Sequence, residues 1–92
     1  ETAQLAMSNL VHPKTEMQGW VKGQGFGAGG RVRIAPGPNG EGVGTFGWGG
    51  AASTIAWVDR TRGIRASGWS QIMTGGDDVF SSGFGEAVYA SL

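Results

Sequence analysis

The residues best suited to chemistry are the glycines of one short segment, Gly44–Thr54. A strand rarely carries this many glycines, because glycine weakens it. Bare backbone can offer N–H and C=O groups to an extended ligand, or direct one N–H at a developing oxyanion. The same glycines would equally let a helix pack closely on the strand. Composition alone does not separate these two interpretations.

A second glycine-rich segment, Gly25–Val32, matches the patterns of a dinucleotide-binding loop and of a kinase phosphate-binding loop. A dinucleotide loop must open a helix, whereas the residues that follow here have the alternation of a strand. A kinase loop needs a downstream lysine, and no lysine follows Lys22. We therefore interpret the segment as a strand whose glycines let another backbone or a ligand come close.

Side chains for acid–base or metal chemistry are scarce. His12, Asp59 and a serine could be combined into a catalytic triad, but His12 precedes the helix-ending Pro13 and is expected at the surface. The pair Asp77 and Asp78 is interpreted as a helix cap and not as a catalytic dyad. The absence of cysteine excludes disulfides and thiolate metal sites. We expect no metal and no cofactor.

The elements that must position these residues are short helices and strands. Helix formers predict a helix over residues 2–10, which ends before Pro13. Period-two alternation predicts a strand over residues 30–35. Further extended segments are expected over residues 43–50 and 64–73, and residues 51–59 either continue the second segment or form a third. Asn39-Gly40 indicates a hairpin turn, and Gly63 suits a positive φ after Asp59. Both faces of the last strand carry apolar groups, so both are expected to be covered.

A C-terminal helix is predicted to begin near Asp77 or Asp78. Four apolar residues recur in it at a spacing of four and form one stripe: Phe80, Phe84, Val88 and Leu92. Gly83 and Gly85 weaken this helix, so packing against the sheet must hold it. The expected fold class is α+β, an antiparallel sheet of three to four strands with a short N-terminal helix and a C-terminal helix packed on it.

Composition restricts the possible functions. Glycine supplies 19 of 92 residues, about three times its usual share. A chain this short and glycine-rich seldom stands without a disulfide, a metal or a partner, so a partner surface is expected. The seven basic residues form no stripe for nucleic acid. No apolar run approaches the roughly 20 residues of a membrane span, and no signal peptide is visible.

A resemblance to a known family begins in the glycine-rich segment Gly44–Thr54. Phe46–Ala52, followed by Ile55–Asp59 and Gly63–Arg65, resembles the C-terminal part of the β-lactamase-related serine hydrolases, in particular the family VIII carboxylesterases and related acyltransferases. Phe84–Tyr89 fits the same branch. The resemblance covers nearly the whole chain, most clearly residues 25–92. It implies a β-lactamase/transpeptidase-like fold, of which residues 1–92 would be the C-terminal portion and not a complete domain.

The resemblance also implies a site. In that family a serine of a Ser-x-x-Lys motif attacks the acyl group, while the lysine and a tyrosine transfer protons. A third motif, Lys-Thr-Gly in β-lactamases and often Trp-Gly-Gly in the esterases, lies on a strand beside the serine. The resemblance places Trp48, Gly49 and Gly50 at this motif. It places the backbone N–H of Ala51 in the oxyanion hole, and Ala52 next to the substrate.

The chain departs from the family at the nucleophile. No serine is followed three residues later by lysine, since Lys14 and Lys22 are the only lysines. No Tyr-x-Asn or Tyr-x-Ser motif occurs, and Tyr89 falls in the last predicted helix. Trp48 in place of lysine removes a positive charge that would bind a β-lactam carboxylate, which favours ester substrates.

We therefore expect the chain to supply one strand-borne wall of a serine esterase or acyltransferase that acts on a small ester. A larger N-terminal chain or segment would bear the Ser-x-x-Lys nucleophile, and this chain alone would be inactive. The competing hypothesis is a non-catalytic, glycine-rich binding or structural module. Neither hypothesis involves nucleic acid or a membrane. A soluble bacterial hydrolase of this kind fits the cytoplasm and the periplasm equally, and the sequence indicates no choice between them.

Overall fold

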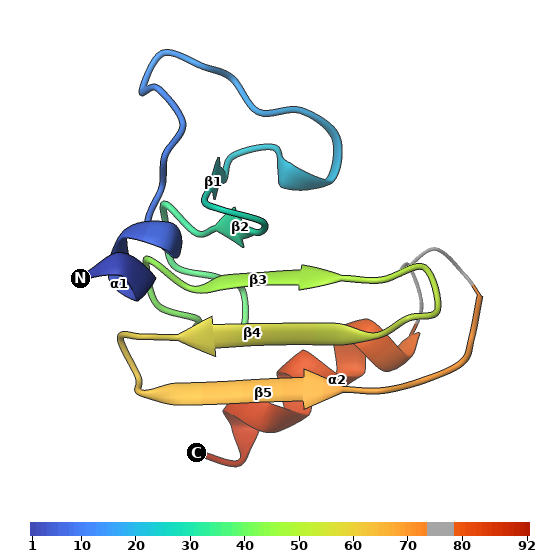
Figure 1. Ribbon diagram of the computed structural model, residues 1–92. Coiled ribbons are helices and arrows are strands. Elements are labelled where there is room, and N and C mark those ends of the chain that lie inside the picture. The colour runs from blue at the N-terminus through green and yellow to red at the C-terminus, as the bar shows by residue number, and fades with distance from the viewer. Residues whose placement is uncertain (74–78) are drawn as a thin grey trace.

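A five-stranded antiparallel sheet forms the centre of the computed structural model, which describes residues 1–73 and 79–92. The strands follow one another in chain order (Figure 1): β1 Gly25–Phe26, β2 Arg31–Val32, β3 Phe46–Gly49, β4 Ile55–Asp59 and β5 Ile64–Gly68. The helices are α1 Thr2–Ala6, the 3₁₀ turn η1 Gly19–Val21 and α2 Val79–Ala90. The α+β class is confirmed, but the sheet has five strands where three or four were expected.

The additional strand comes from the glycine-rich segment Gly25–Val32, which forms the two strands β1 and β2 instead of one. Gly25 pairs with Val32 across a tight turn in which the N–H of Gly27 donates to the carbonyl of Gly30, at 2.8 Å. The other predicted strands exist but are shorter than expected. Residues 51–53 form a turn and not a strand, and the strand predicted over residues 64–73 ends at Gly68. The helix predicted over residues 2–10 ends at Ala6.

Helix α2 packs on one face of the sheet, behind β4 and β5 in Figure 1. Gly68 on β5 permits this contact, since a Cβ there would lie 3.0 Å from the ring of Phe84 and 3.2 Å from that of Phe80. Trp57 on β4 meets Phe84 edge-on, with 5.5 Å between the ring centroids. The predicted packing of the C-terminal helix on the sheet is thus confirmed, and the absence of a side chain at Gly68 makes room for it.

The predicted apolar stripe of α2 is wrong at its last member. Leu92 lies beyond the helix and is 64% exposed. Each step of four residues advances about 40° around a helix, so a fourth member falls about 120° away from Phe80. Tyr89 is buried instead, and its ring stacks on Trp57 with 6.2 Å between centroids. Asp77 and Asp78, the predicted cap, lie outside the described residues.

A buried carboxylate joins β4, the following turn, a loop and α2. Asp59 has no exposed surface. It accepts four hydrogen bonds, from the hydroxyl of Tyr89 and from the backbone N–H groups of Gly42, Thr61 and Arg62. Burial by itself would raise the pKa of Asp59, but these hydrogen bonds together hold its pKa below the usual value.

The remaining surfaces are less covered than expected. No residue of α1 is buried. Two of its carbonyls are hydrogen-bonded to turns of the sheet: that of Ala6 accepts the N–H of Ala28 at 2.8 Å, and that of Gln4 accepts from Arg60 Nη1 at 3.5 Å. The face of β5 opposite α2 is open, since Arg65 is exposed and the following Trp69 is 79% exposed. The expectation that both faces of this strand are covered is therefore wrong for the described residues. None of the described helices is long and apolar enough to cross a membrane.

Candidate functional site

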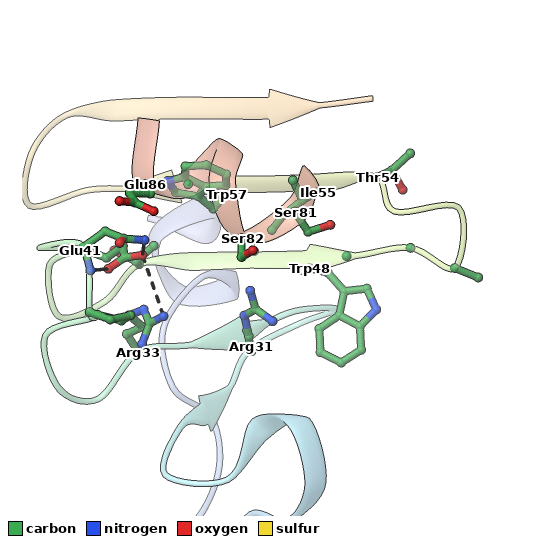
Figure 2. Close-up of a pocket in the computed structure, with 18 residues that line it drawn as sticks. Arg31, Arg33, Glu41, Trp48, Thr54, Ile55, Trp57, Ser81, Ser82 and Glu86 are labelled. Carbon is green, nitrogen blue, oxygen red and sulfur yellow. Dashed lines mark hydrogen bonds and ion pairs between the residues drawn. The ribbon is translucent and has the colours of Figure 1, made fainter. Parts of the chain in front are cut away.

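A groove of about 860 Å³ lies over β3 on the α2 side of the sheet. Its floor is the backbone around Gly47 and Gly49, which bring no side chain. Figure 2 shows side chains on both sides of this floor. Helix α2 supplies one wall, and β2 with the loop after it supplies the other. The charged and hydroxyl side chains of the α2 wall are Ser81, Ser82 and Glu86, and those of the opposite wall are Arg31, Arg33, Glu41 and Thr45.

The glycines of β3 are required for different reasons. A Cβ on Gly47 would overlap the carbonyl oxygen of Ala56 and lie 2.7 Å from the Cβ of Trp57. A Cβ on Gly49 would meet only the carbonyl oxygen of Thr54, at 3.4 Å, which is an ordinary contact. Close packing therefore explains Gly47. It does not explain Gly49, where bare backbone lies open to the groove.

Strand β3 is paired on both sides along its first half alone. β4 pairs with all four of its residues, whereas β2 pairs with Phe46 and Gly47. The N–H of Gly50 bonds the carbonyl of Thr54, at 2.9 Å. Since successive residues of an antiparallel strand direct their N–H and C=O to opposite edges, those of Gly49 point away from β4. No described strand pairs with Gly49 on that side, so one donor and one acceptor are available there.

The hairpin between β3 and β4 holds Ala51. The N–H of Ser53 donates to the carbonyl of Gly50, at 3.1 Å, and among the described non-glycine residues Ser53 alone has a positive φ, 62°. Ala51 and Ala52 therefore occupy the two central positions of a type I turn. Ser53 is fully buried, and its Oγ donates to the carbonyl of Ile72 at 2.7 Å, which stabilises the left-handed conformation. No described group accepts a hydrogen bond from the N–H of Ala51.

Four of the five residues predicted for the site line the groove: Trp48, Gly49, Gly50 and Ala51. Ala52 does not, and its carbonyl accepts a hydrogen bond of 3.1 Å from Ser70 Oγ. The indole of Trp48 is 42% exposed and meets the ring of Phe26 edge-on, with 5.5 Å between centroids. Trp48 thus lines the groove, and its partly exposed side chain is not in the core.

Sequence analysis did not assign the two arginines of the groove to the site. The alternation of residues 30–35 puts Arg31 and Arg33 on one face, but no local signal shows that this face lines a groove. Arg33 Nη2 lies 3.9 Å from Glu41 Oε1. Within the described part of the chain Arg31 has no hydrogen bond or ion pair to its side chain. Burial, and then the charge of Arg33, lower the pKa of Arg31, while Glu41 opposes this effect.

The described lining of the groove does not hold the serine and lysine pair that the resemblance implies. Its described lining includes hydroxyl groups but no His, Lys or Tyr, and a serine hydroxyl needs an adjacent base to attack an ester. His12 is exposed, and its Nδ1 accepts the N–H of Lys14 at 3.1 Å. No three metal-binding side chains gather among residues 1–73 and 79–92. Comparison of the sequence with known family models and with curated proteins finds no match. A proposal for the function of this chain therefore rests on the groove.

Proposed function

We propose that this chain forms one wall of the active site of a serine esterase or acyltransferase with a β-lactamase-like fold. The Ser-x-x-Lys nucleophile would be carried by a larger N-terminal chain or segment. The observation that carries the proposal is the unpaired edge of β3, where the backbone groups of Gly49 and the N–H of Ala51 border the groove beside Trp48.

The edge of β3 suits acyl transfer for a geometric reason. An ester whose acyl part lies along this edge can pair with the N–H and C=O of Gly49, as a further strand would. Its carbonyl oxygen then reaches the N–H of Ala51, which the hairpin turn holds in place before the reaction. A donor fixed in this way stabilises the tetrahedral oxyanion, and one such donor is worth about a hundredfold to a thousandfold in kcat.

The exposed apolar surface of the chain supports the proposal that another segment or chain packs against it. Its accessible area is 5991 Å², about a fifth more than the roughly 5,000 Å² typical of a monomer of 9.5 kDa. Trp69, Met73 and Leu92 are 79%, 75% and 64% exposed. An isolated domain gains little from exposing side chains of this size, whereas a segment packed against other parts of an enzyme would bury them.

Covalent labelling tests the proposal. A fluorophosphonate probe should label the intact protein, which contains this chain and the nucleophile-bearing segment, at the serine of Ser-x-x-Lys. The isolated 92-residue chain should not be labelled, because it has no Ser-x-x-Lys motif and the described lining of its groove has no His, Lys or Tyr to activate a serine. The variants Ser81→Ala and Ser82→Ala should keep full labelling of the intact protein. Labelling of the isolated chain, or loss of labelling in either variant, would contradict the proposal. An intact protein that binds small esters but is neither labelled nor active would establish the non-catalytic binding module instead.

A further inference from the structure

The side chain of Arg31 lines the groove from its β2 side (Figure 2). Arg31 pairs with Gly47 across β2 and β3, and paired residues of neighbouring strands project to the same face. Because Gly47 has no side chain, β3 places no side chain of its own beside the guanidinium at this position. Figure 2 shows Arg31 rising from β2 toward β3, on the same side of the groove as Trp48 and Arg33.

Two arginines line the groove, and of these two Arg31 is the one without an ion pair to a described residue. Arg33 is close to Glu41, at 3.9 Å. Glu86 belongs to the opposite wall, on α2. Among the described side chains none accepts a hydrogen bond from Arg31. A partly buried guanidinium without an acceptor is costly, and the lowered pKa of Arg31 reflects the same loss of solvation. A bound anion would remove that cost.

We propose that the groove accepts an ester that also carries a carboxylate, which Arg31 binds while the scissile carbonyl lies at Ala51. This inference rests on the proposed esterase function. The planar guanidinium can bind a carboxylate through two parallel hydrogen bonds. A single negative charge fits better than the two of a phosphate monoester, since Glu41 and Glu86 also line the groove and would repel the second charge.

The test compares two esters of equal length on the intact protein. The neutral ester is p-nitrophenyl butyrate, and the anionic ester is mono-p-nitrophenyl succinate. Arg31→Gln should lower kcat/KM for the anionic ester by about tenfold to a hundredfold, mainly through KM, because a hydrogen bond between charged groups is lost. The same variant should leave the neutral ester nearly unchanged. Arg31→Lys should restore part of the loss, because it keeps the charge but not the paired hydrogen bonds.

Arg65→Gln is the matched control. Arg65 pairs with Val58, next to Trp57 on β4, so its side chain projects to the face opposite α2, and it does not line the groove. This variant changes the net charge equally and should leave both esters unaffected. An equal effect of Arg31→Gln on both esters, or no effect on either, would overturn the carboxylate site while the esterase function stands.

Two further outcomes remain decisive. If Arg31→Gln does not fold, the salt dependence of the wild-type protein replaces it: added NaCl should raise KM for the anionic ester alone, and an unchanged ratio of the two KM values would refute the site. If the wild-type protein hydrolyses neither ester, the esterase function fails. Monomethyl succinate should still bind more tightly than methyl butyrate in a tryptophan-fluorescence titration, with the difference lost in Arg31→Gln; equal binding would reject the carboxylate site as well.

Discussion

The hydroxyl group of Tyr89 on α2 donates a 2.8 Å hydrogen bond to the carboxylate of Asp59 at the end of β4. The same hydroxyl accepts a hydrogen bond of 3.1 Å from the indole N–H of Trp57. Asp59 in turn accepts the N–H of Gly42 at 3.0 Å. One buried contact thus joins the helix that forms one wall of the groove to the sheet, and through Gly42 to the loop in the opposite wall.

Tyr89→Phe should lower the free energy of unfolding by about 1–3 kcal/mol, because it leaves buried polar groups of Asp59 and Trp57 each without one partner. Urea unfolding measures the difference. Ser91→Ala is the control, since Ser91 follows the end of α2, is exposed, and donates its hydroxyl to the carbonyl of Val88 in the last turn of that helix. If both variants are equally stable, the network contributes nothing.

Alkaline pH should destabilise the fold through the same tyrosine. Burial, and then the hydrogen bond to Asp59, raise the pKa of Tyr89 to about 12. The unfolded chain has a tyrosine pKa of about 10. The stabilisation is therefore complete below about pH 10 and is lost as pH rises toward 12, by roughly 2 kcal/mol. The absorbance of tyrosinate reports this titration directly, because the chain has one tyrosine. Titration near pH 10 in the folded protein would contradict the prediction.

The glycines of β3 should respond differently to alanine. Gly47→Ala should destabilise the protein by about 1–3 kcal/mol or more, because its Cβ would overlap the carbonyl of Ala56. Gly49→Ala should fold with nearly unchanged stability, but should reduce esterase activity of the intact protein, because its methyl group would project into the groove. Thermal melting and kcat/KM separate the two effects. Equal loss of stability in both variants would return Gly49 to a packing role.

Ala51→Pro should abolish most turnover without unfolding the hairpin. Ala51 holds the second position of a type I turn, where proline is favoured, and its N–H has no acceptor in the described part of the chain. The substitution removes an oxyanion donor, so kcat should fall about a hundredfold to a thousandfold while KM changes little. Ala51→Gly keeps the N–H and is the control. A folded Ala51→Pro enzyme with near-normal kcat would exclude the oxyanion role.

Trp48→Ala should change substrate preference more than stability. The indole is 42% exposed, and its recorded ring contact is with Phe26, so the loss of stability should be about 1 kcal/mol. The ratio of kcat/KM for long and short acyl esters should shift, because the substitution removes a side chain that lines the groove. Trp69→Ala, at a 79% exposed position that does not line the groove, should leave this ratio unchanged. A large loss of stability with unchanged preference would place Trp48 in the core.

Local signals in the sequence were sufficient for the α+β class, the order of the elements and several turns. Gly63 has a φ of 70°, as predicted, and Gly40 lies in the predicted turn, where its N–H donates to the carbonyl of Gly37 at 3.1 Å. Such preferences depend on a few neighbouring residues. The C-terminal helix and its contact through Phe84 also followed from periodicity. Strand ends were less predictable, since a strand ends where its partner ends. The esterase assignment and the role of Ala51 remain predictions that rest on the resemblance and on the groove.

Contacts between distant residues decided the rest. Ser53 adopts a positive φ, unusual outside glycine, and the carbonyl of Ile72 that binds its hydroxyl is 19 residues away. Asp59 is paired with a tyrosine 30 residues away. In the sequence Gly47 and Gly49 are equivalent glycines of one motif. The tertiary structure makes them different. The backbone of β4 and the side chain of Trp57 press against Gly47, whereas β2 pairs with Gly47 but does not extend far enough to pair with Gly49.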